Sequence, residues 1–389
     1  MTANAGYHAY ATGDVLTSAQ VQYNLQNQTV MYFATTTARD AALTGAILVE
    51  GMVSYTPATG VMYYNGSAWT AVGASVPTSY GFTAGKNKII NGDFGVWQRG
   101  TSFTSATGYT ADRWTTGGFA TTVTQQAFTA GTAPVSGYES AYFLQAASVS
   151  GGVANLVQKI EDVRTYAGQS VTLSYWAKID SAANITTYFT QNFGTGGSTT
   201  VDNINITATS TTTSWARYTV SFTVPSISSK TVGTSSFLAL NIYAPASRTM
   251  SIWGVQLEAG SSATSFQTAT GTIQGELAAC QRYYYRLTGS ASFGTISSFG
   301  NAASGSAAYP VFVLPVTMRT APTSVDSANV LLSDLSTNYT GGTITLDSGA
   351  TSPNLASITY TTSGLTTYRP YVLRGNNNGA AYLGVSAEL

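Results

Sequence analysis

Charged side chains are scarce in this chain. Lysine, arginine, aspartate and glutamate make up 8% of its 389 residues, against about 25% in ordinary soluble proteins. The 16 basic and 16 acidic residues give a net charge of zero and form no basic stripe. We therefore expect no binding to nucleic acid. Neutral polar residues take the place of charge, and this composition is typical of β-rich proteins that work outside cells.

Cysteine and histidine each occur once. The single cysteine, Cys280, excludes an internal disulfide framework. The single histidine, His8, has no serine or cysteine motif around it, so neither triad nor zinc chemistry is expected. The chain has no run of about 18 apolar residues and no signal-peptide pattern at its start. We expect no membrane insertion, and release inside an assembled particle would explain how the protein leaves a cell.

The first 85 residues predict a small module with a helix and a β-meander. Residues 17–20 have the pattern of a capping box ahead of a helix, and 37–40 offer a weaker cap. Three short strands are expected, at 51–55, 61–64 and 68–72. Asn65 and Gly66 predict a tight hairpin between the last two. Such a meander is marginally stable alone, so we expect it to pack on another copy or on a partner.

Alternation of apolar and polar residues dominates the middle of the chain, from Lys86 to Thr268. In 171–179, the side chains of Val171, Leu173 and Tyr175 share one face. The same period recurs in three further segments, 218–224, 238–242 and 253–257. Short alternating strands separated by turn-rich segments favour an antiparallel sandwich or jelly roll.

A short helix is expected to lead out of the sandwich. Four residues spaced 4, 3 and 4 apart form a narrow apolar stripe: Ile273, Leu277, Cys280 and Tyr284. The stripe is compatible with a coiled-coil seam about a threefold axis and equally with a helix lying on its own domain. After it the chain returns to short strands and polar turns, which predict a C-terminal β domain.

Three separate stretches carry a family resemblance. They are residues 86–100 with 110–114, residues 255–266, and residues 276–286. In this order and spacing they resemble the fibre and tail-tip proteins of tailed bacteriophages, whose sandwich is similar to carbohydrate-binding modules. The first two stretches look like the opening and closing strands of one sandwich, and the third looks like a helix leaving it. The resemblance implies a non-enzymatic, homotrimeric structural protein of the virion.

The resemblance also assigns a role to each part of the chain. These parts are a virion-attachment module at 1–85, a jelly roll at 86–268, a connecting helix at 269–288 and a C-terminal β tip domain at 289–389. The first would bind other virion proteins, and the last would contact polysaccharide on the host cell surface. Two alternatives stay open: a head fibre or capsid decoration protein, and a polysaccharide-degrading tailspike enzyme. A bacterial adhesin is disfavoured because no signal peptide is present.

The predicted glycan contacts lie in the C-terminal domain, because neutral sugars are bound by aromatic stacking and amide hydrogen bonds. They are Tyr339, Tyr368, Tyr371, Asn376, Asn377 and Asn378. Turns rich in asparagine, glycine and tyrosine have the same composition without any ligand. Four tryptophans that might stack on sugars are instead expected in the core: Trp97, Trp114, Trp176 and Trp253.

Two further groups of polar residues have the composition of a metal site or of a structural network. In carbohydrate-binding sandwiches of this kind, oxygen atoms near the first and last strands can hold a structural calcium, and Asn91, Asp93 and Glu258 could supply them. Alternatively, 91–93 is a turn with local side-chain bonds. No other cofactor is expected. The second group, Arg99, Asp112 and Arg113, could form a fixed polar network at one end of the sandwich.

Glycoside hydrolysis needs two carboxylates about 5 to 10 Å apart. The acidic residues of this chain are scattered along the sequence, and the adjacent pair Glu161 and Asp162 would point to opposite faces of a strand. We therefore assign no catalytic residues.

Overall fold

The computed structural model describes residues 30–44, 48, 50–72, 85–117, 120–136, 141–149 and 151–389. The chain is mainly β, as predicted, with two α-helices in these ranges. It divides into two compact units, Met1–Gly81 and Phe82–Leu389. His8 and the helix predicted after residues 17–20 lie outside the described residues.

The first unit contains the predicted meander. Strands β2 (Val53–Thr56), β3 (Gly60–Tyr64) and β4 (Trp69–Ala71) pair in antiparallel order, and β1 (Met31–Tyr32) adds to β2 in parallel. Helix α2 (Thr36–Ala42) begins after Thr35, whose hydroxyl accepts the N–H of Ala38. The cap predicted at 37–40 is therefore two residues too late. The guanidinium of the buried Arg39 lies 4.6 Å from the centroid of the Trp69 ring.

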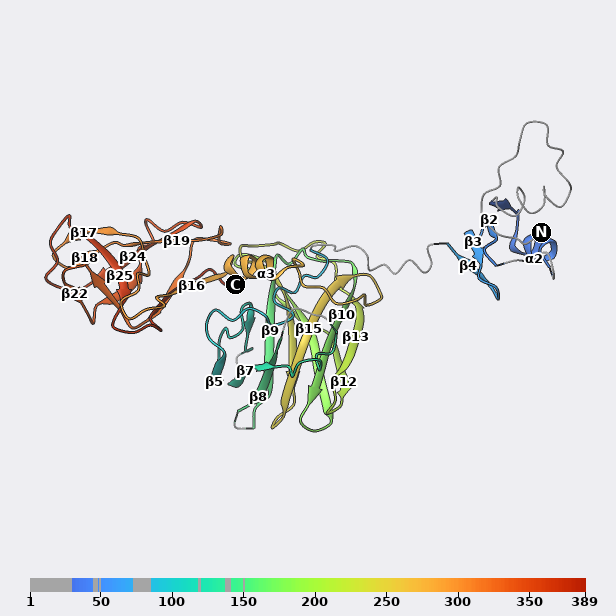
Figure 1. Cartoon of the computed structure of the whole chain (residues 1–389), viewed down its shortest axis with the longest axis horizontal. Coiled ribbons are helices and arrows are strands. Elements are labelled where there is room, and N and C mark those ends of the chain that lie inside the picture. Colours follow the sequence, from blue (N-terminus) through green and yellow to red (C-terminus); the bar gives the residue numbers. More distant parts are fainter. Residues whose placement is uncertain are drawn as a thin grey trace, which may run out of the picture. The chain divides into compact units, whose positions relative to one another are not determined.

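Two antiparallel sheets form the sandwich of the second unit (Figure 1). The six-stranded sheet has the order β13 (Ala216–Thr223), β10 (Ser170–Ile179), β15 (Thr249–Ala259), β8 (Tyr142–Ser148), β7 (Thr121–Ala127) and β5 (Ser102–Ala106). The five-stranded sheet has the order β12 (Val201–Thr211), β11 (Ala183–Asn192), β14 (Phe237–Ala244), β9 (Ala154–Glu161) and β6 (Trp114–Thr115). The middle of the chain is therefore an antiparallel β-sandwich, as predicted.

The main core lies between these two sheets. The predicted inward residues of β10, Val171, Leu173 and Tyr175, are fully buried and pack against residues of the five-stranded sheet such as Phe189 and Leu240. The alternation predicted this face correctly because successive side chains of a strand point to opposite faces of its sheet.

The segment predicted to open the sandwich, residues 86–100, is not a strand. It forms turns that run against β15: Lys88 N–H donates to the Leu257 carbonyl at 3.0 Å, and Val255 N–H donates to the Gly92 carbonyl at 2.9 Å. A Cβ on Gly92 would lie 2.2 Å from the Val255 oxygen. The segment therefore needs glycine at this close approach, and it joins the closing strand without regular pairing.

Helix α3 (Ile273–Gln281) is shorter than predicted, and only the later half of the apolar stripe, Cys280 and Tyr284, is buried. Ile273 and Leu277 are 42% and 38% exposed, whereas Glu276 and Cys280 are fully buried. Tyr284 lies beyond the helix, in strand β16. The helix lies on its own unit through the buried thiol of Cys280, a member of the predicted stripe, and through the buried carboxylate of Glu276, which apolar periodicity does not indicate.

Hydrogen bonds from the protein satisfy the buried carboxylate of Glu276. It accepts the N–H of Asn91 at 2.7 Å, and it accepts the N–H and hydroxyl of Thr270 at 2.7 and 2.9 Å. Three donors make burial of this group tolerable. Glu276 thereby attaches α3 to the opening segment of the sandwich.

The C-terminal part is built from two further sheets. The smaller has the order β16 (Tyr284–Thr288), β26 (Tyr382–Ser386) and β20 (Ser324–Ala328). The larger has the order β19 (Val311–Val313), β24 (Leu355–Thr361), β18 (Ala307–Ala308), β17 (Gly300–Ser304), β25 (Pro370–Gly375), β21 (Val330–Ser333) and β22 (Asn338–Tyr339), with β23 (Thr343–Leu346) paired to β24. Their shared core includes Phe312, Tyr360 and Leu383. Because β16 belongs to this core, the helix predicted over 269–288 ends too late.

Candidate functional site

The six predicted glycan contacts do not form one surface. Tyr368 precedes β25, while Asn376, Asn377 and Asn378 follow it, and six residues of strand span about 20 Å. Tyr371, inside the strand, is fully buried, and its hydroxyl accepts the N–H of Thr366 at 2.9 Å. Its assignment as a glycan contact is wrong. Tyr339 is partly exposed, and its ring packs against that of Tyr371 with centroids 5.7 Å apart.

Two exposed apolar side chains stand at neighbouring turns of the C-terminal part. Leu335 and Tyr368 are 61% and 82% exposed, and both have left-handed backbones, with φ of 69° and 67°. Asp334 and Arg369, which adjoin them in the sequence, form an ion pair of 3.0 Å. Such backbones are strained for these residue types. We call Leu335 and Tyr368 the tip pair.

The three predicted calcium ligands take part in different interactions. The Asn91 side-chain oxygen accepts the N–H of Val96 at 2.9 Å, and its amide nitrogen donates to the Val96 carbonyl at 2.9 Å. Glu258 forms an ion pair of 3.1 Å with Lys86, and Asp93 is buried. In the described ranges no group of three or more histidine, cysteine, aspartate or glutamate residues is arranged to hold a metal. The contacts of Asn91 fit the alternative of a turn with local side-chain bonds.

The tryptophans of the opening motif support the core. Trp114 is fully buried, and its indole N–H donates to the Asn91 carbonyl at 3.0 Å. Trp97 is partly buried, packs on the core and donates to the Phe94 carbonyl at 2.7 Å. The core role predicted for Trp114 is confirmed, and Trp97 covers the edge of the same cluster.

An aromatic cluster covers the outer face of the six-stranded sheet. Its members are Phe128, Phe143, Trp176, Trp215, Trp253 and Phe266. Trp253 was predicted to share a face with Val255 and Leu257, but the pairing of β10 with β15 shifts register here and Gly254 has a φ of 65°. This bulge turns Trp253 to the opposite face. Trp253 is fully buried there, with the Phe266 ring 5.0 Å away.

The chain's own cations occupy ring faces of this cluster. The guanidinium of Arg217 lies 4.6 Å from the centroid of Trp176, and the ammonium of Lys178 lies 5.4 Å from that of Trp215. These cation–π contacts and the ring–ring contacts use the surfaces on which a sugar would stack. This face is therefore a poor candidate for stacking on a glycan.

The outer face of the five-stranded sheet is different, because it presents two partly exposed tyrosines. Tyr188 of β11 lies directly opposite Asn241 of β14, and Tyr243 is the next outward residue of β14. The two rings meet edge to face with centroids 6.2 Å apart. Both are partly exposed. We call Tyr188, Tyr243 and Asn241 the tyrosine face.

Polar side chains order the tyrosine face. The Asn241 amide donates to the Thr190 hydroxyl at 3.3 Å, and that hydroxyl donates to the carboxylate of the exposed Asp202. Burial, together with Asp202 and Tyr243, raises the pKa of Tyr188. The face thus combines two partly exposed rings with a hydroxyl and an exposed carboxylate, whereas the buried Asn241 amide orders these groups. Aromatic rings and such polar groups bind neutral hydroxyls.

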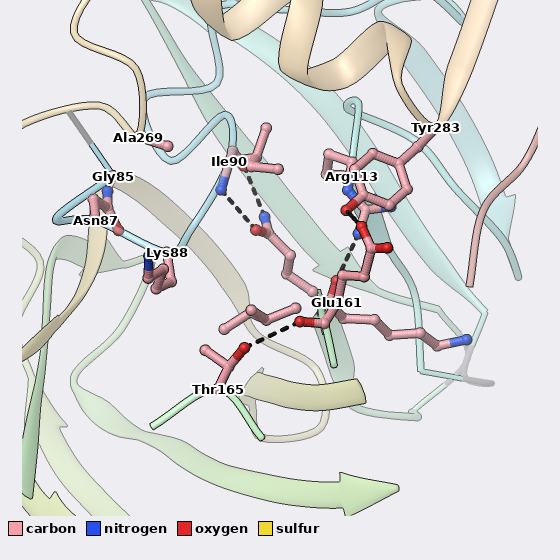
Figure 2. Close-up of a pocket in the computed structure, with 12 residues that line it drawn as sticks. Gly85, Asn87, Lys88, Ile90, Arg113, Glu161, Thr165, Ala269 and Tyr283 are labelled. Atoms are coloured by element: carbon pink, nitrogen blue, oxygen red, sulfur yellow. Dashed lines mark hydrogen bonds between the residues drawn. The ribbon is translucent and has the colours of Figure 1, made fainter. Parts of the chain in front are cut away.

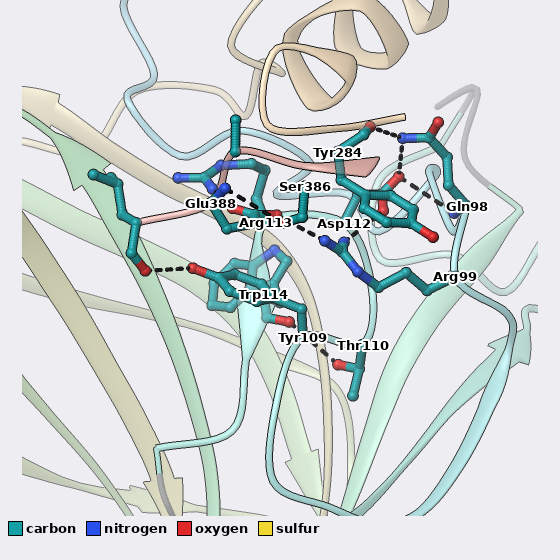
Figure 3. A network of polar contacts seen from close by, with 12 residues as sticks. Gln98, Arg99, Tyr109, Thr110, Asp112, Arg113, Trp114, Tyr284, Ser386 and Glu388 are labelled. Atoms are coloured by element: carbon teal, nitrogen blue, oxygen red, sulfur yellow. Dashed lines mark hydrogen bonds and ion pairs between the residues drawn. The ribbon is translucent and has the colours of Figure 1, made fainter. Parts of the chain in front are cut away.

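The predicted polar network at one end of the sandwich exists and extends further than expected (Figure 3). Arg99 contacts Asp112 at 3.3 Å and also Glu388 at 3.3 Å, and Glu388 forms an ion pair with Arg113. Gln98 donates to Asp112 at 2.9 Å and to the Tyr284 carbonyl at 2.8 Å. The network therefore joins the sandwich to β16 and to the residues that follow β26.

Asp112 is the most perturbed carboxyl of this network. It is 1% exposed, and burial raises the pKa of Asp112 to about 6, against the opposing effects of Arg99 and of the hydrogen bonds from Gln98. Asp112 and Glu388 both contact Arg99, so two carboxylates that are far apart in the sequence do meet here. Both are buried. We interpret the pair as a structural network, because neither residue lines a pocket described below.

A pocket of about 260 Å³ lies beside the end of β9 (Figure 2). Side chains that line it include Lys88, Arg113, Gln158, Lys159, Thr165 and Tyr283. Figure 2 shows Lys88 on one side and Arg113 with Tyr283 on the other. The Gln158 amide exchanges two hydrogen bonds of 2.8 Å with the backbone of Ile90, which fixes the inner wall. We call this cavity the β9 pocket. A second cavity, of about 230 Å³, is lined by Gln145, Lys178, Asp180 and Ser251.

One acidic residue lines the β9 pocket, and it is fully engaged. Glu161 binds the Arg282 guanidinium with both oxygens at 3.1 Å and accepts the Tyr283 hydroxyl at 2.7 Å. A carboxylate held in this way is a poor candidate for a general acid or base.

None of the helices in the described ranges is long and apolar enough to cross a membrane.

Comparisons with known proteins find structural likeness only. No family model and no curated protein matches the sequence. Among solved structures, the enzymatically active domain of bacteriophage CBA120 tailspike protein 4 is similar, with 16% identity over 45% of this chain and a TM-score of 0.31. The match spans 22% of that domain's length.

Two further solved structures illustrate the range of this likeness. The CBM22-1 xylan-binding domain of Paenibacillus barcinonensis Xyn10C shares 17% identity over 42% of this chain and 94% of its own, with a TM-score of 0.28. A cyclase from Fischerella sp. TAU shares 12% over 45% and 97%, with a TM-score of 0.30. All three scores are below 0.5, and the assignment of a β-sandwich rests on the sheet order of this chain.

Proposed function

We propose that this protein is a non-enzymatic structural component of a bacteriophage virion, a homotrimeric tail fibre or tail-tip protein that binds polysaccharide on the host surface. The observation that carries the binding function is the tyrosine face. It offers two partly exposed rings beside an ordered amide on a continuous sheet. A rigid sheet holds such groups in place before the ligand arrives, which reduces the entropy lost on binding.

The virion role is supported by the composition and by the three sequence stretches that resemble phage fibres. The same stretches have structural work in this fold: the opening segment docks on β15, and Glu276 of the third stretch binds Asn91 of the first. Residues 1–85 would then attach the protein to the particle. A trimer would present three tyrosine faces, and several weak sites acting together would give useful avidity.

Binding of the full-length protein to an array of bacterial surface polysaccharides tests the proposal. Tyr188→Ala and Tyr243→Ala should each weaken binding about tenfold, because stacking on one ring is worth roughly 1 kcal/mol or more. Tyr368→Ala, at the tip pair, is the matched control that also tests the C-terminal alternative. Native mass spectrometry of the same samples should give the mass of an oligomer of three chains.

Two results would count against this function. Equal binding by the wild type and both tyrosine-face variants would exclude the face, and loss of binding in Tyr368→Ala alone would move the contact to the C-terminal part. Circular dichroism should show that all three variants remain folded, because each of these side chains is at least partly exposed.

A further inference from the structure

A threonine hydroxyl and a glutamine amide meet near the end of β15. Gln256 and Glu258 lie on the same side of this strand and are 0% and 1% exposed. Thr264, beyond the strand, donates its N–H to Glu258 at 2.9 Å, which brings its side chain beside both residues. The Gln256 Nε2 donates to the Thr264 Oγ1 at 3.3 Å. Because the amide carbon is bonded to Nε2, this carbon lies within about 4.6 Å of the hydroxyl oxygen.

Glu258 is placed to act as the base for this hydroxyl. The Thr264 hydroxyl donates to one carboxylate oxygen at 2.8 Å, and the Gln256 Nε2 donates to the other at 2.6 Å. One carboxylate thus contacts both the hydroxyl and the amide nitrogen. Burial acts to raise the pKa of Glu258, but hydrogen bonds, chiefly from Thr264 and Gln256, outweigh it and lower the pKa. These bonds keep the buried carboxylate ionised and able to accept a proton.

Two further groups are positioned to stabilise charge during an attack on the amide. The Gln267 N–H donates to the Gln256 Oε1 at 2.8 Å, which is the position of an oxyanion donor. The Lys86 ammonium contacts the Thr264 hydroxyl oxygen and forms an ion pair of 3.1 Å with Glu258. A nucleophile, a base, a carbonyl group and an oxyanion donor are therefore held together at one place.

We propose that the side chains of Thr264 and Gln256 form an intramolecular ester after folding, a cross-link that needs no cysteine. The Thr264 oxygen attacks the Gln256 amide carbon, and Glu258 takes the hydroxyl proton. The electron pair of the carbonyl moves to Oε1, where the Gln267 N–H stabilises it. The bond from carbon to Nε2 then breaks, Glu258 returns the proton to the nitrogen, and ammonia leaves. A hydroxyl and an amide become an ester and ammonia, so the balance requires no oxidant and no other reactant.

Folding has already paid the entropy of bringing these groups together. The reacting atoms still need to approach by about 1 Å to reach the roughly 3–3.5 Å of a reacting pair. The product fastens the segment that leads from the sandwich to α3. Hydrogen bonds of this segment exchange with water when the protein is denatured or stretched, whereas a covalent bond keeps residue 264 on β15. This inference does not depend on glycan binding or on the virion role.

Mass spectrometry of the full-length protein tests the proposal. The ester should lower the mass by about 17 Da, because one ammonia is lost. Trypsin gives a peptide of residues 249–282 that contains both side chains, and this peptide should carry the whole shift. It contains no asparagine, so loss of ammonia from asparagine cannot produce the shift there. Fragment ions from backbone breaks between 256 and 264 should be absent, and alkaline hydroxylamine should open the bond.

Variants assign the roles. Thr264→Val lacks the hydroxyl and Glu258→Gln lacks the base, so neither should show the shift, whereas Thr264→Ser keeps a hydroxyl and should show it. Thr268→Val is the matched control in the same peptide, and it should keep the shift because the Thr268 hydroxyl accepts the Gly271 N–H at 3.0 Å. The wild-type mass decides the proposal even where a variant does not fold.

Three results would overturn the ester. They are an unshifted mass of the wild type, a shift that persists in Thr264→Val, and a shift that joins peptide 249–282 to the peptide containing Lys86. The last result would mean that the lysine amine, rather than the threonine hydroxyl, had displaced the ammonia. Such an amide would also resist hydroxylamine.

Discussion

Glu388 forms an ion pair with Arg113, and the same carboxylate reaches Arg99 at 3.3 Å. The side chains of Arg113 and Glu388 are 1% and 6% exposed. A residue next to the last position of the sequence thus neutralises a cation buried in the sandwich, and it does so from beyond β26. The C-terminal sheets and the sandwich are tied together by charge as well as by packing.

Glu388→Ala should destabilise the protein by about 3–5 kcal/mol, because it leaves the buried Arg113 without a counter-charge. Urea unfolding followed by tryptophan fluorescence measures the change. Arg164→Ala is the matched control: its ion pair with Asp162 is 3.2 Å long, but the two side chains are 61% and 45% exposed. Breaking that pair should cost about 1 kcal/mol or less. Similar losses in both variants would mean that the buried pair is not needed for stability.

The pH dependence of stability should carry a contribution from Asp112. Burial raises its pKa to about 6 in the folded protein, against roughly 3.9 in an unfolded chain. The folded state therefore binds this proton more tightly, so stability from Asp112 increases as the pH falls through 6 and becomes constant below the unfolded pKa. Arg99 opposes the shift and Glu388 adds to it.

Comparison with Asp112→Asn isolates this group. The difference in the free energy of unfolding between wild type and variant should move in favour of the wild type between pH 7 and pH 4.5. Other titrating groups are common to both proteins and cancel in the difference. A difference that stays constant over this range, or moves the other way, would show that Asp112 titrates in its ordinary range.

Strand positions in the sandwich were predictable, because alternation alone decides which side of a strand is buried. Val171, Leu173 and Tyr175 followed that rule. Trp253 did not, because a bulge at Gly254 reverses the face, and a left-handed glycine within an apolar strand is not visible in a hydrophobic pattern. The conformation of the opening segment was also not predictable, since its contacts with β15 come from turns rather than from regular strand pairing.

The candidate site was only partly predictable for a similar reason. Residue type pointed to tyrosine and asparagine, but it did not separate the buried Tyr371 from the exposed Tyr368 three positions earlier. The tyrosine face was missed altogether, although the alternation of 184–192 places Tyr188 on the outer side of a strand. Tyr188 lies opposite Asn241 because β11 and β14 are neighbours in the sheet. No local sequence pattern contains this strand order.

Gly92→Ala should destabilise the sandwich, because the new Cβ would lie 2.2 Å from the Val255 oxygen. Relief requires the opening segment to move away from β15 and to stretch the bond from Val255 N–H to the Gly92 carbonyl. We expect a loss of about 2 kcal/mol or more, as for overpacked sites. Thermal unfolding measures it, with Gly131→Ala as control, since nothing lies within 4 Å of a Cβ there although its φ of 78° adds some strain. An unchanged Tm in Gly92→Ala would contradict the close docking.

Tyr371 and Tyr368 should respond in opposite ways to substitution. Tyr371→Ala empties a fully buried site in the C-terminal core and should cost about 3–5 kcal/mol. Tyr371→Phe keeps the ring and loses only the hydrogen bond from Thr366, so it should cost about 1 kcal/mol. Tyr368→Gly removes an 82% exposed side chain from a backbone with φ of 67°, and relief of that strain should stabilise the protein by about 1 kcal/mol. Urea unfolding of the three variants tests this ranking. A destabilised Tyr368→Gly would show that the Tyr368 ring makes stabilising contacts in solution, for example with a second copy of the chain.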